Sequence, residues 1–322
     1  KLNVGADIQL FNSLNLTVDA FREIRSNILT TKGSIPNYLG AAKTVIYGNF
    51  AKVKNWGVDL AVDYGKQINR DLSIQFKGTF TFARNRVMET DEAADIRPAL
   101  SAVGKPLNTL WGYVADGLYI DEAGIANNPT STLGNITIAA GDVKYVDQPD
   151  VNGNYDGQID SDDRVAIGHP TIPEIIYGFG PSITWKKWDF SVFFQGQANV
   201  SLMMSGFEPF GTQSKNNVLE WIAEDYWSKE NQNPNAKYPR LTKYNNNNNM
   251  QSSTYWLRNA AFLKLKNAEV GYNFKWGRVY MSGTNLLTFS PFKLWDPEMG
   301  GGKGMAYPTQ RTFNLGVQIT FK

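Results

Sequence analysis

The sequence contains no cysteine and a single histidine, His169. Without cysteine the chain can form neither a disulfide framework nor a thiolate metal centre. One imidazole does not supply most zinc sites, and no nucleophile pattern surrounds His169, for which we expect a structural role. The sequence offers no set of residues for covalent chemistry. We therefore predict that the protein is not an enzyme.

The sequence also lacks long apolar runs and a strong excess of either charge. No run approaches the roughly 18 apolar residues of a membrane-spanning helix, which excludes a helical membrane protein but leaves a membrane β-barrel open. The net charge of +2 is too small to indicate the excess of basic residues that is typical of nucleic-acid-binding proteins. No signal peptide is recognisable, and the chain opens and closes on strand patterns. We therefore expect a piece of a longer protein.

What the sequence has in abundance is two-residue alternation. In the closing stretch RTFNLGVQITFK, every second residue from Phe313 to Phe321 is apolar, as in a strand with one apolar and one polar face. A slip of phase between Leu265 and Ala268 indicates a β-bulge. The same pattern predicts nine strands, covering residues 2–10, 14–20, 56–64, 72–82, 177–185, 188–194, 268–274, 279–289 and 313–321.

The connections between these strands alternate strictly between short and long. The short ones are 12–13, 65–70, 186–187 and 275–276, and the long ones are 26–53, 85–172, 200–256 and 290–311. Outer-membrane barrels have short periplasmic turns and long extracellular loops, and aromatic residues at the strand ends fit an interfacial belt. We therefore predict an all-β fold, part of a transmembrane antiparallel β-barrel lying in a lipid bilayer. The alternative is a soluble β domain with core aromatics.

Strand direction assigns the long connections to the outside. Residues 85–172 then form an extracellular loop, in which we expect 109–120 to be a hairpin. Residues 200–256 form a second extracellular loop with a short helix in 216–228, where apolar residues follow three-four spacing. The asparagine tract 245–249 is expected to be a low-complexity loop tip. The C-terminus is predicted to be periplasmic.

Aromatic residues of these loops are candidates for substrate contact by ring stacking. The helical stretch supplies Trp221, Tyr226 and Trp227, and the strand-like stretch supplies Trp111 and Tyr113. Such rings suit sugars or a protein cap equally well. The alternative is that the helix packs on its own loop.

The stretch NGNYDGQIDSDD, residues 152–163, matches a calcium-binding loop of the EF-hand type. Gly157 stands at position six, where the sharp turn needs glycine, and Gln158 at position seven would offer its backbone carbonyl. Asp147 or Asp150 could supply further charge. The predicted ligands of a structural Ca²⁺ are Asn152, Asn154, Asp156, Gln158, Asp160 and Asp163. The alternative is an acidic turn that binds no ion.

Several long segments resemble the SusC/RagA group of TonB-dependent transporters. They are GNFAKVKNWGVDLAVDY (48–64), GDVKYVD (141–147), DSDDRVAIGHPTIPEIIYGF (160–179), WDFSVFFQGQ (188–197), YWLRNAAFLKLKNAEVGYNF (255–274), RVYMSGTNLLTFSPFKLWDPEM (278–299) and YPTQRTFNLGVQITFK (307–322). The resemblance implies that residues 1–322 are a C-terminal barrel segment with about nine of roughly 22 strands. The plug domain and the segment that binds TonB have no counterpart in this sequence.

By this resemblance, the expected function is TonB-dependent import of oligosaccharides or peptides across the outer membrane of a Gram-negative bacterium. A SusD-like surface lipoprotein would be the partner, and TonB would act through the missing N-terminal region. Two alternatives stay open. The first is a passive or structural barrel without energy coupling, such as a porin or adhesin. The second is a soluble secreted β protein that binds or hydrolyses carbohydrate.

Overall fold

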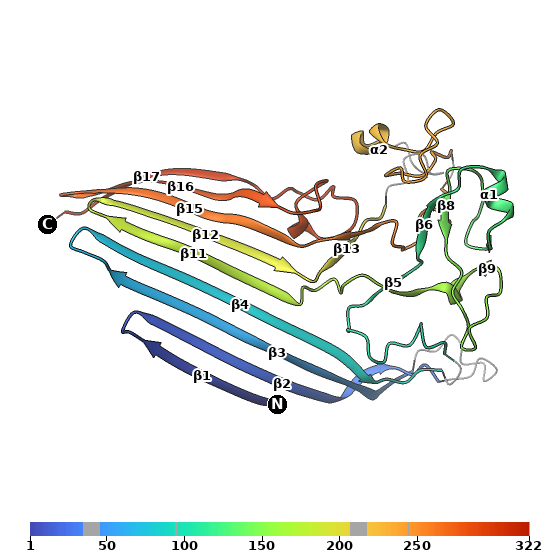
Figure 1. Cartoon of the computed structure of the whole chain (residues 1–322), viewed down its shortest axis with the longest axis horizontal. Helices are drawn as coiled ribbons and strands as arrows, with labels where there is room; N and C mark the ends of the chain where they lie inside the picture. Colours follow the sequence, from blue (N-terminus) through green and yellow to red (C-terminus); the bar gives the residue numbers. More distant parts are fainter. Residues whose placement is uncertain (35–45, 94–95, 207–217, 244, 322) are drawn as a thin grey trace.

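The computed structural model describes residues 1–34, 46–93, 96–206, 218–243 and 245–321. Nine strands form one sheet in which every neighbouring pair is antiparallel (Figure 1). In spatial order they are β1 (Leu2–Leu10), β2 (Leu14–Thr31), β3 (Tyr47–Gln67), β4 (Leu72–Glu89), β11 (Ile175–Trp185), β12 (Trp188–Ala198), β15 (Phe262–Phe274), β16 (Gly277–Phe289) and β17 (Thr312–Ile319). Each of the nine segments predicted from the alternation forms one of these strands, although β17 ends at Ile319.

The register of the sheet separates an apolar face from a polar face. Leu60 lies opposite Val18 on one side and Phe80 on the other. One residue earlier in β3, Asp59 lies opposite Asp19 and Thr81. Because side chains alternate between the two faces of a strand, each strand places its apolar set on the same side of the sheet.

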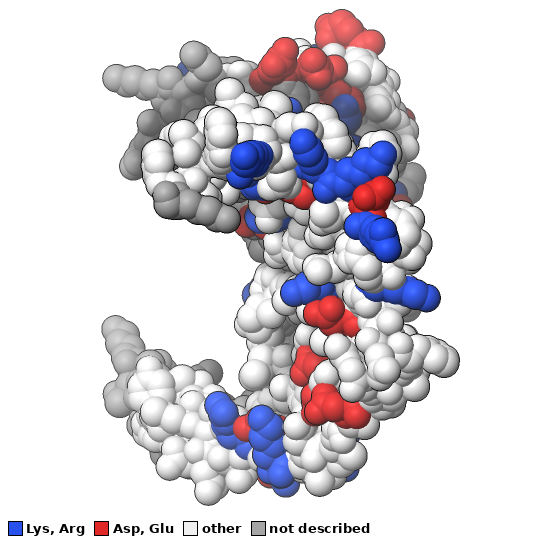
Figure 2. Space-filling view, turned by 90° about the vertical axis from the view of Figure 1, so that its left-hand side faces the viewer, with Lys and Arg blue, Asp and Glu red and all other residues white. Residues whose placement is uncertain are grey.

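The apolar face of the sheet is largely uncovered within the described chain. Leu315 and Val317 of β17 are 81% and 61% exposed, and Val4 of β1 is 63% exposed. Figure 2 looks along the strands from the turn end and shows a C-shaped outline, hollow on one side. An apolar area of this extent needs a bilayer or further protein to cover it.

The predicted bulge in β15 is confirmed. The register shifts between Phe193 and Phe194 on the β12 side, and between Leu265 and Asn267 on the β16 side. The extra residue in β15 explains the change of phase in the sequence.

The connections predicted at 26–53 and 85–172 are shorter in the structure, because the strands on either side extend into them. Strands β2 and β3 remain paired as far as Thr31 and Tyr47, and β4 continues to Glu89. Register shifts on either side of Ile28 break the alternation while the strands stay hydrogen-bonded. The hydrophobic period therefore ends before the strand does.

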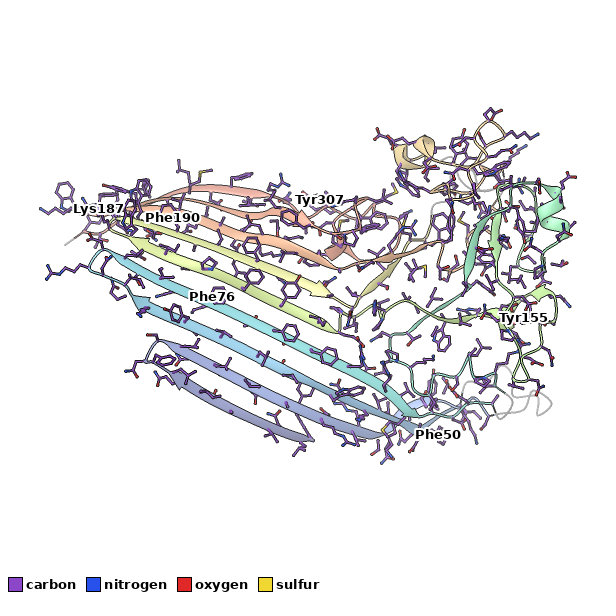
Figure 3. The ribbon with its side chains drawn as sticks, viewed as in Figure 1. Phe50, Phe76, Tyr155, Lys187, Phe190 and Tyr307 are labelled. Carbon is purple, nitrogen blue, oxygen red and sulfur yellow. The ribbon has the colours of Figure 1, made fainter. Side chains whose placement is uncertain are left out.

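The loop end of the sheet carries small strands and short helices (Figure 1). They are β5 (Leu110–Gly112), β6 (Ala115–Leu118), α1 (Glu122–Ala126), β7 (Thr130–Ser131), β8 (Val143–Tyr145), β9 (Gln158–Ile159), η2 (Ser161–Asp163), β10 (Val165–Ile167), β13 (Ser201–Met203), α2 (Glu220–Glu224), β14 (Leu257–Asn259) and η3 (Pro297–Met299). Within the described ranges, no helix is long and apolar enough to cross a membrane. Figure 3 places Lys187 at the turn end and Tyr155 at this opposite end.

The hairpin predicted for 109–120 is wrong. Strand β5 pairs with β10 and strand β6 pairs with β8, so the two halves of the stretch do not pair with each other. Between them, Tyr113 donates its backbone N–H to Ser252 O, in the other long loop. Long-range pairing, which local alternation does not reveal, decides the partners.

The helix predicted within 216–228 is shorter than expected. Residues 216–217 lie outside the described part, and α2 covers Glu220–Glu224 with no side-chain cap at its start. It ends because the following residues pair elsewhere: Tyr226 forms a β-bridge with Tyr238, and Trp227 N–H donates to Tyr238 O.

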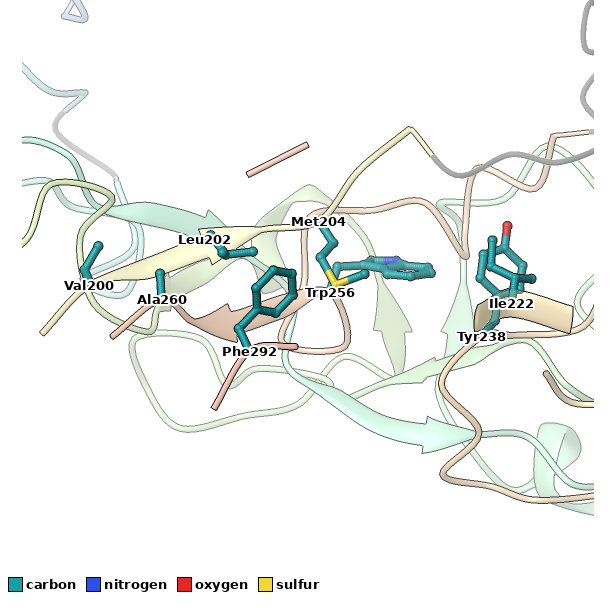
Figure 4. Packing of buried hydrophobic residues seen from close by; sticks show 8 residues of the cluster. All are labelled: Val200, Leu202, Met204, Ile222, Tyr238, Trp256, Ala260 and Phe292. Atoms are coloured by element: carbon teal, nitrogen blue, oxygen red, sulfur yellow. The ribbon is translucent and has the colours of Figure 1, made fainter. Parts of the chain in front are cut away.

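Two hydrophobic clusters form the core of the loop end. The first contains Val200, Leu202, Met204, Ile222, Tyr238, Trp256, Ala260 and Phe292 (Figure 4). The second contains Tyr113, Leu118, Val143, Tyr145, Ile159, Trp227 and Ala236. Both clusters combine residues from different long loops, so these loops pack against one another and do not fold separately. We call the part of the loops built around these two clusters the loop body.

The asparagine tract is not a loop tip. Asn246, Asn248 and Asn249 are almost fully buried, whereas Asn245 and Asn247 are exposed. Asn248 donates to Val143 O, and Asn249 accepts a hydrogen bond from Val143 N–H. Amide side chains can donate and accept at once, which lets this tract satisfy the buried backbone of the neighbouring loop.

Candidate solute-binding surface

The polar face of the sheet carries cross-strand hydrogen bonds between side chains. Thr17 donates to Asp7 at 2.6 Å, and Thr81 donates to Asp59 at 2.7 Å. Nearer the turn end, Arg278 forms ion pairs with Asp189 and Glu269. This face is hydrogen-bonded and charged, as a surface in contact with water or a polar solute must be.

A cavity of about 460 Å³ lies where β2, β3 and β4 meet the loops. Its volume lies in the range of small-molecule sites. The strands and the loop segments 107–108 and 170–174 contribute its lining, which comprises Glu23, Arg25, Ile28, Val53, Asn55, Ala83, Asn85, Leu107, Asn108, Pro170, Ile172, Pro173 and Glu174.

The lining combines charged, amide and aliphatic groups. A guanidinium nitrogen of Arg25 lies 3.4 Å from a carboxylate oxygen of Glu23; the Arg25 side chain is exposed and that of Glu23 is partly exposed. Asn55 lies opposite Asn85 in the β3–β4 register, and Asn85 accepts a hydrogen bond from Leu107 N–H. No aromatic side chain lines this cavity among the residues described. The lining therefore offers hydrogen-bond donors and acceptors beside apolar contact, as sites for small polar solutes do.

One wall of the cavity is fixed by an ion pair whose carboxylate is buried and whose guanidinium is partly exposed. Glu174 is 5% exposed and accepts hydrogen bonds from Arg84 Nε and a terminal guanidinium nitrogen, at 2.7 and 2.6 Å. Its backbone carbonyl accepts from Ala83 N–H, which extends the β4–β11 pairing by one residue. The bidentate geometry holds the wall in a single arrangement.

The connection from β16 to β17 is anchored to the sheet by a buried lysine. Lys264 lies opposite Gln195 and is fully buried. Its ammonium group donates to both carboxylate oxygens of Asp296 and to Glu298. Burial alone would raise the pKa of Asp296, but the Lys264 ammonium and the Thr309 hydroxyl outweigh it and hold that pKa below its ordinary value.

The five aromatic candidates from the sequence do not form one stacking platform. Tyr113 and Trp227 are 3% and 6% exposed and belong to the second cluster. Trp221 and Tyr226 are partly buried against the first cluster, and Trp111 is partly buried in β5. Tyr113 and Trp227 thus have no free ring face in this conformation, and the helix packs on its own loop region.

The predicted calcium loop is held by its own hydrogen bonds. Asp163 is 2% exposed and accepts from Gln148 N–H and Asp160 N–H, at 2.7 Å each. Asp156 and Asp160 accept from Gln158 N–H and Asp162 N–H, respectively. Burial raises the pKa of Asp163. These carboxylates are therefore partly used by the backbone of the loop.

The fit of this loop to a cation is incomplete. Across the described ranges, no three acidic or histidine side chains are grouped as metal ligands. Asn152 and Asn154 lie exposed, and their backbone N–H groups donate to Asp150. One oxygen of buried Asp147 has no hydrogen-bond partner, as an oxygen available to a cation would. Calcium binding stays a prediction.

The cavity residues were not singled out from the sequence. Arg25, Asn55 and Asn85 lie where the strands continue beyond the clean alternation, and a cluster drawn from three strands and two loop segments leaves no local motif. The available signal is a set of polar residues next to strand ends on the long-loop side. That signal indicates a region rather than residues.

Comparisons with known proteins agree with the fold. No family model matches the chain. The chain is 24% identical to TonB-dependent receptor P3 of Formosa agariphila over all of its own length and 34% of the receptor. It is 22% identical to TonB-dependent receptor SusC of Bacteroides thetaiotaomicron, over 85% of the chain and 27% of SusC. The chain thus spans about a third of the length of these relatives.

A solved structure of the RagAB peptide transporter has the same fold. It matches with a TM-score of 0.72 and 23% identity, covering 99% of this chain and 35% of that one. The resemblance read from the sequence is confirmed: the relatives are TonB-dependent receptors, SusC among them, and the fold is that of a portion of the RagA barrel. The predicted fold class, part of an antiparallel transmembrane β-barrel, is confirmed with it.

Proposed function

We propose that this chain, a homologue of the SusC-type TonB-dependent receptors, forms wall and external loops of an outer-membrane nutrient importer. The observation that carries the proposal is the sheet: its apolar face is exposed, its polar face is hydrogen-bonded, and its loops pack at one end. These features suit a barrel wall between lipid and an aqueous lumen.

The solute class that suits the cavity is an oligosaccharide or a peptide. Its amide and charged groups can bind hydroxyl or peptide groups, while Ile28, Val53 and Leu107 offer apolar contact. The relative of known structure is described as a peptide transporter. The packed loop body above the cavity offers a surface for a SusD-like lipoprotein, and TonB would act through a segment outside this chain.

Energy-dependent uptake tests this proposal. A bacterium that expresses the receptor carrying this chain should accumulate a labelled peptide or oligosaccharide mixture, and dissipating the proton gradient should abolish accumulation. Changing Arg25→Ala together with Asn55→Ala should weaken uptake, whereas Asn247→Ala, exposed in the loops, should leave it unchanged. Uptake that persists without the proton gradient would contradict the proposal and favour a passive barrel.

A further inference from the structure

Lysine and tryptophan stand side by side at the turn end of the sheet. The β11–β12 turn reads Trp185-Lys186-Lys187-Trp188, and the β15–β16 turn reads Lys275-Trp276. The Lys186 ammonium lies 5.6 Å from the centre of the Trp185 ring, and the Lys275 ammonium lies 5.7 Å from that of Trp276. Both cations are thus positioned next to indole faces.

The aromatic rings at this end are free of protein neighbours on much of their surface. Trp185 and Trp188 face each other across the turn and are 50% and 41% exposed, and Trp276 is 66% exposed. Trp185 and Trp188 continue the apolar face of the sheet, in which Phe190 lies one step further from the turn. Figure 3 shows Phe190 next to Lys187 at this end.

Backbone hydrogen bonds join three turns into one rim. Lys186 N–H donates to Asp71 O, and Asn273 N–H donates to Lys187 O. The exposed basic residues of these turns are Arg70, Lys186, Lys187 and Lys275, which we call the basic turn rim. Figure 2, which looks onto this end, shows Lys and Arg side chains gathered in its upper half.

Few acidic groups compensate the basic turn rim. Asp71 is the acidic residue within these three turns and lies next to Arg70. Asp189, the first acidic residue of β12, is already engaged by Arg278 and Asn273. The lysines of the rim make no ion pair within the described residues. The rim therefore presents uncompensated positive charge directly beside exposed indoles.

We propose that the basic turn rim binds the phosphate groups of anionic phospholipids in the membrane leaflet that it faces. From sheet to turn, the surface passes from aliphatic and phenyl groups to indoles and then to ammonium groups. A phospholipid has the same order, from acyl chain through glycerol to phosphate. Indole rings prefer this interfacial depth, and lysines near an anionic surface are attracted to it.

This inference rests on the proposed barrel function, since it requires the sheet to lie in a bilayer. A free phosphate ion would use only the ammonium groups and would not need the row of exposed indoles. A phospholipid satisfies both parts of the surface. We therefore assign the rim to a lipid rather than to a soluble anion.

Lipid selectivity in nanodiscs tests the assignment. The receptor carrying this chain is inserted into phosphatidylcholine nanodiscs containing spin-labelled phosphatidylglycerol or spin-labelled phosphatidylcholine, and the motionally restricted fraction of each lipid is measured. We expect phosphatidylglycerol to be preferred. The triple variant Lys186→Gln, Lys187→Gln, Lys275→Gln should reduce this preference by about fivefold or more, the factor expected for even one basic residue at an anionic surface.

Two variants serve as controls. Replacing the same three lysines by arginine keeps the charge and should keep the preference. The triple Lys229→Gln, Lys293→Gln, Lys303→Gln removes exposed lysines of the loops and should not change it. Two results would overturn this inference alone. One is that the receptor inserts but shows no preference for phosphatidylglycerol. The other is that the triple loop variant loses this preference as much as the triple rim variant does. Failure to insert at all would overturn the barrel function together with it.

Discussion

Arg240 and Asp142 form a two-point ion pair between the two long loops. Arg240 Nε donates to Asp142 Oδ1 at 2.7 Å, and a terminal nitrogen donates to Oδ2 at 3.0 Å. Asp142 is fully buried and also accepts from the side-chain amides of Asn246 and Asn249. This carboxylate therefore joins a loop before β11 to one before β15.

Removing the Asp142 carboxylate should unfold the loop body. In Asp142→Ala, the guanidinium of Arg240 and two buried amides lose their acceptor, which costs about 3–5 kcal/mol for a broken buried pair. We expect limited proteolysis to cleave within 115–160 and 220–255 while the strands stay protected.

The matched control is Asp116→Ala, which breaks the exposed pair with Lys144 in the same loop and should cost less than about 1 kcal/mol. Equal protease sensitivity of the two variants would contradict this account.

The asparagine tract offers a second test, because its members differ in burial rather than in chemistry. Asn249→Ala removes a buried acceptor of Val143 N–H and a donor to Asp142, with an expected cost of about 1–3 kcal/mol for each group left unsatisfied. Asn247→Ala changes an exposed neighbour in the tract and should be nearly neutral. Chemical denaturation followed by tryptophan fluorescence separates the two outcomes, because Trp256, whose indole N–H donates to Asn249 O, contributes to the signal.

The strands could be predicted from the sequence because their signal is local. Alternation from Leu72 to Phe82 or from Phe313 to Phe321 reports which side of a strand meets an apolar environment, whatever its neighbours are. The strand ends at Thr31 and Glu89 could not be predicted, because the apolar residues there stand next to each other in the sequence and no longer alternate. Ile28 and Leu29 do so in β2, and Val87 and Met88 in β4, while the strands remain paired.

The loop body and the cavity depend on partners about 100 residues apart. Asn248 donates a hydrogen bond to Val143 O. The sequence around either residue gives no indication that the other is its partner. A run of asparagines has the composition of a loop tip, and burial alone distinguishes the two roles. The cavity combines Arg25, Asn85 and Pro170 from separate segments, so only the folded chain reveals it.

Acid should release the β16–β17 connection from the sheet. The pKa of Asp296 is lowered in the folded protein, so the stability that it contributes is complete above its ordinary value of 3.8 and is lost as the pH falls through the lower folded value. Hydrogen exchange of residues 291–305, corrected for intrinsic rates, should therefore rise below about pH 4.

Two variants check that Asp296 is responsible. In Asp296→Asn the segment should exchange faster already at neutral pH, and its dependence on acid should weaken. Lys266→Gln removes a partly exposed contact to Glu298 and should have little effect. An unchanged acid profile in Asp296→Asn would assign the transition to another group.

Calcium binding at 152–163 can be tested with terbium, which replaces calcium and is sensitised by nearby tyrosine. Tyr155 lies within the loop and is 66% exposed. If the predicted site forms, terbium luminescence should rise and be displaced by calcium, and the double variant Asp156→Asn, Asp160→Asn should abolish it. Asp121→Asn, which caps α1 outside the loop, should not. Absence of a signal would show that the prediction is wrong and that hydrogen bonds alone hold the loop.

The last strand should pair with a polypeptide segment outside the described sheet. β17 is bonded to β16 from Thr312 to Ile319, and no described strand occupies its other edge. Nine antiparallel strands leave β1 and β17 running in the same direction, so these two cannot close an antiparallel barrel with each other. An open edge of this length would also invite aggregation.

In the receptor carrying this chain, every amide of β17 should resist hydrogen exchange as strongly as those of β12, which has neighbours on both sides. Exchange of alternate β17 amides at solvent rates would mean a bare edge and would contradict closure.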